Sequence, residues 1–185
     1  MNKPIEISAV TLKTDRLTLR PWRETDLNDL YEYAKVDGVG QMAGWLPHAN
    51  IDVSKTILER FIEGKKTFAL ELDGKVIGSL GIEHYKESSY PELDALQGRE
   101  IGYVLSKNFW GKGLMPEAVR AVIDYLFEAE ALDFVIISHF QWNKQSARVI
   151  EKCGLQYVKT TTHETHFGTQ ETTLEHILYN PDKKA

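Results

Sequence analysis

The sequence predicts an α/β fold. It indicates one domain over residues 1–185, with a mixed, largely antiparallel sheet of about seven strands flanked by about four helices. Three observations predict this. Seven short segments are apolar throughout or alternate apolar with polar residues, as strands do. Four longer segments repeat apolar residues at helical spacing. The order of these segments gives neighbouring antiparallel strands early and a crossover through a helix later.

The first elements are one strand and two helices. "RLTLRPW" alternates apolar and polar residues, and Pro21 ends this strand because proline cannot donate to a sheet ladder. A helix begins at Thr25 or Asp26 and ends before Gly38. A second helix covers residues 52–62, where four apolar residues form one stripe.

The middle of the chain predicts a hairpin, a third strand and a buried helix. "TFALEL" and "VIGSLGIEHY" flank Asp73 and Gly74, a strong signal for a tight turn. "REIGYVLS" is a further strand. The helix from Pro116 to about Glu130 is apolar on more than one side, so we expect it to be well buried against the sheet.

The last third predicts a central strand, a short helix and two more strands. "FVIISHFQW" is almost continuously apolar, which is typical of strands covered on both faces. Asn143 caps a helix that stops at Gly154. Two strands follow, near residues 156–162 and 172–179.

Composition narrows the function class. The net charge of −5 argues against a general nucleic-acid binder. A single cysteine, Cys153, excludes an intrachain disulfide and fits a reducing cytoplasm. The opening "MNKPIEISAV" lacks the apolar stretch of a secretory signal, and no apolar run is long enough to span a membrane. We therefore expect a cytoplasmic protein.

A glycine loop at the start of the third helix carries the strongest functional signal. In "NFWGKGLMPEA", Gly111 and Gly113 bracket Lys112, and Met115 before Pro116 cannot cap the helix. Uncapped amides, the positive end of a helix and a lysine together describe an anion site. The alternative is an ordinary glycine turn between a strand and a buried helix.

Two phosphate-binding motifs are excluded. The triphosphate loop GxxxxGK[ST] does not occur in the chain. The dinucleotide motif GxGxxG fails because Pro116 occupies the position of its third glycine. An anion at this loop is therefore not the phosphate of a nucleoside triphosphate or of NAD.

Four segments in the same order resemble one known family. "EIGYVLSKNFWGKGLMPEAVRAVIDYLF" followed by "NKQSARVIEKCGL" resembles the GNAT superfamily of acetyl-CoA-dependent N-acetyltransferases. "TDRLTLRPWRETDLNDLYEYA" and "GKVIGSLGI" resemble its ribosomal-protein branch, the RimJ/RimL-like enzymes. The resemblance implies a sheet splayed in its middle, acetyl-CoA as cosubstrate without a metal, and a primary amine, preferably a protein N-terminus, as acceptor.

The resemblance also implies which residues bind the cosubstrate. The family loop Q/R-x-x-G-x-G/A, which binds the diphosphate, aligns with Trp110, Gly111, Lys112, Gly113, Leu114 and Met115. Trp110 and Met115 depart from the general pattern, and Met115 replaces a small residue. Val104 and Leu105 would offer main-chain groups to the pantetheine arm. Asn143 and Ser146 would contact the cofactor from the start of the next helix, although Asn143 is also explained as a cap.

The resemblance implies candidate catalytic residues as well. The Ser146 hydroxyl would protonate the departing thiolate, and the Val104 amide would bind the acyl oxygen. Glu164 in "THETHFG" and Glu100 in "EIGY" compete as the general base, and for each the alternative is a solvated glutamate at a strand end. An α-amine, with a pKa of about 8, needs less help from a base than a lysine, with a pKa of about 10.4.

Several alternatives stay open. The acceptor could be a small-molecule amine, and the chain could be a silent acyl-CoA-binding module or a plain interaction domain. His163 and His166 are three residues apart, which is not the HExxH zinc spacing, so no metal is expected. Many members of the resembled family are dimers, and nothing in this sequence specifies a homodimer.

Overall fold

The computed structural model describes residues 1–183, which form one eight-stranded sheet with the strand order β1-β2-β3-β4-β5-β6-β8-β7. The strands are β1 (Leu12–Lys13), β2 (Thr18–Pro21), β3 (Thr67–Leu72), β4 (Lys75–Glu83), β5 (Gly98–Leu105), β6 (Phe134–Phe140), β7 (Gln156–Glu164) and β8 (Gln170–Tyr179). The helices are α1 (Leu27–Ala34), α2 (Ile51–Gly64), α3 (Leu114–Glu128) and α4 (Lys144–Lys152). The predicted α/β fold class is confirmed, and the short β1 is the strand that the sequence did not predict.

Local signals placed most element ends correctly. Asp73 and Gly74 both have positive φ, 50° and 80°, and join β3 to β4 in the predicted tight turn. Asn143 caps α4. The α1 helix is shorter than predicted, because a 3₁₀ turn at Glu24–Asp26 precedes it and it ends at Ala34. The α2 helix begins at Ile51, one residue earlier than predicted, because the Asn50 side chain caps it.

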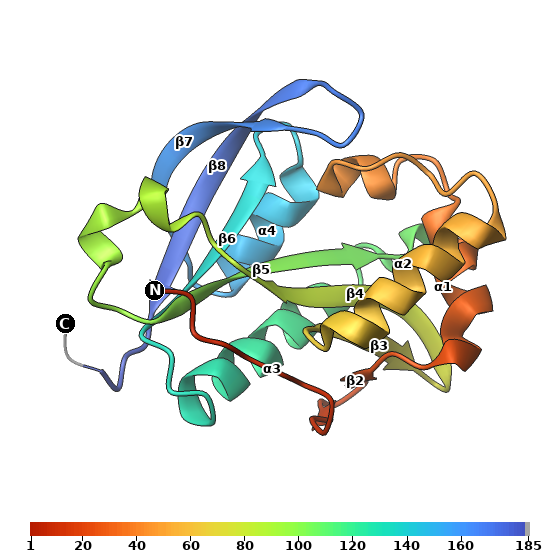
Figure 1. The fold of residues 1–185 in the computed structure, drawn as a ribbon, viewed down its shortest axis with the longest axis horizontal. Helices are drawn as coiled ribbons and strands as arrows, with labels where there is room; N and C mark the ends of the chain where they lie inside the picture. The colour runs from red at the N-terminus through yellow and green to blue at the C-terminus, as the bar shows by residue number, and fades with distance from the viewer. Residues whose placement is uncertain (184–185) are drawn as a thin grey trace.

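The helices cover the two faces of the sheet. On the front face, α1 and α2 pack against residues such as Ala69 and Val76. On the back face, α3 and α4 pack against a larger core that includes Phe68 and Leu80. Figure 1 shows α1 and α2 together at one end of the molecule and α3 below the sheet. Within residues 1–183, no helix has both the length and the apolar character needed to cross a bilayer.

The sheet splits between β5 and β6. These strands are the parallel pair joined by the α3 crossover, and they pair only from Gly98 to Glu100, opposite Phe134 to Ile136. Beyond Glu100, β5 remains paired with β4, while β6 remains paired with β8. The two strands therefore diverge, and the predicted splay opens in the middle of the sheet (Figure 1).

Candidate active site

A cavity of about 390 Å³ occupies the gap between the diverging strands. Its walls come from β5, from the end of β6, from α4 and from the glycine loop before α3. The 3₁₀ turn Gly40–Ala43 and the β7–β8 hairpin add residues at one side. All the predicted site residues line it except Lys112 and Glu164. Those that line it are Glu100, Val104, Leu105, Trp110, Gly111, Gly113, Leu114, Met115, Asn143 and Ser146.

The glycine loop has the backbone that its sequence requires. Gly111 and Gly113 have φ of 75° and 78°, in the left-handed region that other residues rarely adopt. The α3 helix begins at Leu114, two residues earlier than predicted, with Gly113 as its cap residue and no side-chain cap. Pro116 is therefore third in the helix, still within the first turn, where its missing N–H removes no intrahelical bond.

The main-chain amides of this loop are unpaired. Trp110 N donates to Lys107 O at 3.2 Å, and Glu117 N donates to Gly113 O at 3.3 Å. Between them, the amides of residues 111–115 have no acceptor anywhere in residues 1–183. This row of free donors at the positive end of a helix fits an anionic diphosphate. These are the groups that would bind the diphosphate of coenzyme A.

An arginine from the start of the chain fixes the loop. Arg16 Nη1 donates to Lys112 O at 2.9 Å, and Arg16 Nε donates to Glu117 Oε2 at 2.7 Å. Sequence reasoning missed Arg16, because it lies far from the loop along the chain and no local pattern marks it. The Lys112 ammonium lies 5.0 Å from the centre of the Phe109 ring. Met115 is buried in the back-face core.

The exposed edge of β5 offers further main-chain groups. Ser106 N donates to Ile77 O of β4 at 2.8 Å, and pairing partners alternate along an antiparallel strand. The main-chain groups of Val104 are therefore directed toward β4, whereas those of Tyr103 and Leu105 face the gap. Val104 and Leu105 were both expected to serve the gap, and the register gives this position to Leu105 and Tyr103. The Leu105 carbonyl already accepts from Trp110 Nε1 at 2.8 Å.

A chain of polar contacts joins α4 to β5. Asn143 Oδ1 accepts from Ser146 N at 3.0 Å, and Asn143 Nδ2 donates to Met42 O at 3.2 Å. Ser146 Oγ lies 2.8 Å from the Tyr103 hydroxyl. Burial raises the pKa of Tyr103, so its phenol stays protonated at neutral pH. Tyr103 was not predicted, because in sequence it is one more apolar position of a strand.

Glu100 is a partly buried residue of β5, and its carboxyl group lies in the wall of the cavity. Burial raises its pKa to about 7, the charges of Glu175 and Glu83 act in the same direction, and the Ser138 side chain opposes them. A carboxyl group with this pKa is part protonated and part ionised near neutral pH, which suits a general base.

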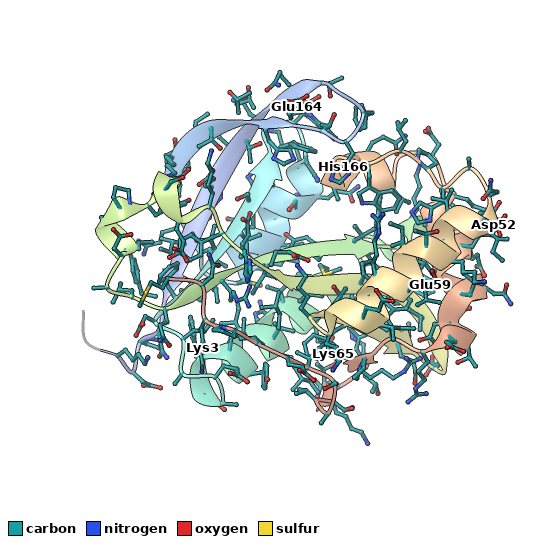
Figure 2. All side chains as sticks on the ribbon, in the orientation of Figure 1. Lys3, Asp52, Glu59, Lys65, Glu164 and His166 are labelled. Atoms are coloured by element: carbon teal, nitrogen blue, oxygen red, sulfur yellow. The ribbon has the colours of Figure 1, made fainter. Side chains whose placement is uncertain are left out.

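Glu164, the competing candidate, does not reach the cavity. It is exposed at the end of β7 (Figure 2). Figure 2 also shows His166 at the tip of the β7–β8 hairpin, where its main-chain N–H donates to Gly44 O at 2.9 Å. This contact joins the hairpin to the loop after the 3₁₀ turn Gly40–Ala43. This loop and the β7–β8 hairpin therefore meet beside the cavity.

The sequence that forms this sheet and cavity matches one known protein family. Residues 16–156 match the model of the acetyltransferase (GNAT) domain. This range contains the glycine loop, the splayed strands and every residue of the cavity except those from the β7–β8 hairpin.

The chain belongs to the GNAT acetyltransferase family.

Relatives of this GNAT chain support the assignment. The uncharacterized N-acetyltransferase p20 of Bacillus licheniformis is 28% identical over 154 residues, which are 79% of this chain and 82% of the relative. A GNAT-family acetyltransferase from Bacillus anthracis has a TM-score of 0.80 and 20% identity, covering 94% of this chain and 100% of that one.

A second solved structure, the ribosomal-protein-S5-alanine acetyltransferase of Vibrio fischeri, has a TM-score of 0.71 and 20% identity, covering 95% of this chain and 100% of that one. Family membership and these relatives identify the chain as an acetyl-CoA-dependent acetyltransferase.

Proposed function

We propose that this GNAT enzyme acetylates the α-amine of a protein N-terminus, as the RimJ/RimL-like branch does, with Glu100 as the general base. The observation that carries the proposal is the raised pKa of Glu100, about 7, in the wall of the cavity. A base of this pKa matches an α-amine, whose pKa is about 8, far better than a lysine side chain, whose pKa is about 10.4. The Vibrio fischeri enzyme, which acts on a ribosomal protein, has the same fold and motivates the acceptor class.

Each wall of the cavity has a role in this reaction. Acetyl-CoA supplies an acetyl group activated as a thioester. The free amides of residues 111–115 bind its diphosphate, and the gap-facing main-chain groups of Tyr103 and Leu105 align its arm and offer N–H donors to the acyl oxygen. Glu100 takes the proton of the attacking amine on the front face.

The hydroxyl pair of Tyr103 and Ser146 serves the leaving group. Tyr103 lies on the back face of β5, and Glu100 lies on the front face, so acid and base bracket the gap from opposite sides. Ser146, hydrogen-bonded to Tyr103, donates its proton to the departing thiolate and recovers one through the Tyr103 hydroxyl. The Ser146 and Tyr103 hydroxyls would lie next to the reacting sulfur only when acetyl-CoA fills the gap.

The proposal is tested by thiol release from acetyl-CoA with peptides that begin with Ala, Ser or Met. We expect acceptor-dependent release with a free N-terminus. We expect none when the N-terminus is blocked and only a lysine side chain is free. Glu100→Gln should lower kcat by about 10²-fold or more. Equal rates on blocked, lysine-containing peptides would refute the acceptor class, and acetyl-CoA binding without any acceptor-dependent release would indicate a silent module.

A further inference from the structure

A row of polar side chains crosses the sheet next to Glu100. Ser138 on β6 lies opposite Glu175 on β8, and Glu175 lies opposite Lys159 on β7. Directly opposite residues of antiparallel strands project from the same face of the sheet, with their Cβ atoms about 5 Å apart. The row begins at the cavity, because Ser138 lines it and the Ser138 side chain hydrogen-bonds the Glu100 carboxyl group. Ser138 thus links Glu100 to a charged pair outside the cavity wall.

Three donors fix the Glu175 carboxylate. Its Oε1 accepts from Thr161 Oγ1 at 2.7 Å, and its Oε2 accepts from the Tyr90 hydroxyl. Lys159 Nζ lies 3.9 Å from the same Oε2. An ionised carboxylate can only accept hydrogen bonds, so three donors match the charged form of Glu175. The Glu175 side chain is 15% exposed, so little water screens its charge from the cavity.

The segment between β4 and β5 covers this carboxylate. Tyr90 from this segment is 3% exposed and makes an edge-to-face contact with Tyr85, with 5.9 Å between the ring centres. The Lys159 ammonium lies over the Tyr90 ring, 3.4 Å from its centre, and donates to Ser89 O. Figure 1 shows the segment beside β7 and β8. These contacts hold Tyr90 and Lys159 against Glu175 in one arrangement.

Two carboxylates and one phenol face Glu100 from the neighbouring elements. Glu83 on β4 lies directly opposite Glu100, and Lys66 forms an ion pair with Glu83. Glu175 acts from the β8 side, and the charges of both carboxylates disfavour the ionised form of Glu100. Burial raises the pKa of the Tyr90 phenol, so this group is neutral. The Glu83 side chain is 43% exposed, so water screens its charge more strongly than that of Glu175.

We propose that Glu175 is a positioning residue for catalysis: from across Ser138, its charge sets the pH at which Glu100 accepts a proton. The statement rests on the proposed function, in which Glu100 takes the proton of the attacking amine. Glu175 keeps Glu100 a strong proton acceptor, because a nearby negative charge favours the protonated form. Lys159 has the opposite effect, since it offsets the charge of Glu175. Neither Glu175 nor Lys159 lines the cavity, so both act through Glu100.

Two substitutions that each remove one charge test the proposal, because they should change the rate in opposite directions. Glu175→Gln removes the negative charge and keeps the shape, whereas Lys159→Met leaves Glu175 without its lysine. The measurement is kcat/KM for one peptide between about pH 5.5 and 8.5, expressed as the ratio of variant to wild type. This ratio cancels the titration of the acceptor amine, which is common to all the enzymes compared.

Glu175→Gln should be faster than wild type at low pH, a gain that structural damage does not produce. The substitution should lower the titration midpoint of Glu100 by about one pH unit, which gives a ratio of about five at pH 6 and about one at pH 8. Lys159→Met should raise the midpoint by about half a unit. Its rate should therefore be about threefold below wild type at pH 6 and near wild type at pH 8.

Matched control variants come from the exposed side of α2. Glu59→Gln, at a position labelled in Figure 2, and Lys55→Met remove the same charges outside the cavity wall and should give a ratio of about one at every pH. Lys159→Met tests the proposal independently if Glu175→Gln folds poorly. The inference fails if the ratio for Glu175→Gln does not vary with pH, or if both variants change it in the same direction.

A carbon-13 NMR titration separates this inference from the proposed function. It follows the side-chain carboxyl signal of Glu100, assigned by its absence in Glu100→Gln, and it needs no acceptor. A midpoint that falls in Glu175→Gln supports the inference even when peptides are inert and the proposed acceptor is refuted. An unchanged midpoint overturns the inference and leaves N-terminal acetylation standing. If Glu100→Gln keeps the wild-type pH profile, Glu100 is not the base and both proposals are overturned.

Discussion

The Tyr103 hydroxyl on β5 lies 2.8 Å from Ser146 Oγ on α4. Tyr103 and Ser146 come from opposite walls of the gap. The contact between their hydroxyls therefore joins β5 to α4 on the back face of the sheet. Asn143 supports the pair by accepting from the Ser146 amide at 3.0 Å. The pair thus depends on the divergence of β5 from β6, which leaves room for α4 to approach β5.

Removal of either hydroxyl should lower the rate of the chemical step. If Ser146 protonates the thiolate with the help of Tyr103, Ser146→Ala and Tyr103→Phe should each lower kcat by about 10- to 100-fold with little change in KM. The double variant should be little worse than the worse single variant, because the two groups act as a unit. Steady-state kinetics measures this, with the exposed Tyr157→Phe as control. Multiplicative losses would show that the two hydroxyls act separately.

The rate should depend on the protonation of Glu100. Only the ionised carboxylate accepts a proton and only the neutral amine attacks, so kcat/KM should rise steeply with pH up to about 7. It should then rise less steeply and level above the pKa of the acceptor amine, about 8. A pH–rate profile on one peptide checks this. The Glu100→Gln variant should lose the limb near pH 7, and a profile unchanged by that substitution would remove Glu100 as the base.

Glu100 should also lower the stability of the fold at neutral pH. Its folded pKa, about 7, lies above the ordinary value near 4.5, so the folded state binds more protons between these values. The free energy of unfolding should therefore fall as pH rises from about 4.5 to 7, by roughly 2 kcal/mol. Urea unfolding of wild type and Glu100→Gln at pH 5 and pH 8 measures the difference. The variant should gain relative stability only at the higher pH.

A carboxylate at the helix start should compete with coenzyme A. In Gly113→Asp the new side chain lies at the cap position of α3, where it can accept from the amides that would bind the diphosphate and repels the anion. We expect isothermal titration to show coenzyme A affinity reduced by about 10-fold or more. Gly168→Asp is the control, because Gly168 also has positive φ but lies on the hairpin tip. Equal affinity of wild type and Gly113→Asp would place the diphosphate elsewhere.

Loss of Arg16 should weaken cosubstrate binding without changing the chemistry. Arg16 ties Lys112 O and Glu117 together, and so holds the loop amides in one arrangement. Arg16→Ala should raise KM for acetyl-CoA several-fold and leave kcat nearly unchanged, because no reacting atom touches Arg16. Its ion pair is partly exposed, so the free energy of unfolding should change by less than about 1 kcal/mol. Arg60→Ala on the exposed side of α2 is the control. A fall in kcat alone would contradict this role.

The sequence by itself determined the local elements and the loop. The spacing of apolar residues located the strands and helices. Asp73 and Gly74 indicated a turn that requires positive φ. The missing capping residue before Pro116 indicated that the first amides of the helix are unpaired. These features depend on residues within one or two turns of each other, so a local pattern is sufficient to predict them. The boundaries of α1 and α3 moved because a 3₁₀ turn and a glycine cap replaced the expected starts.

The tertiary structure alone decided which residues meet at the cavity. It separated Glu100, partly buried beside the gap, from Glu164, exposed on the hairpin, although in sequence both are glutamates at the end of a strand. It joined Tyr103 to Ser146, 43 residues apart, and Arg16 to Glu117, 101 residues apart. Register, strand divergence and burial arise from packing between distant segments. No short stretch of sequence contains that information, because both members of each contact are required to define it.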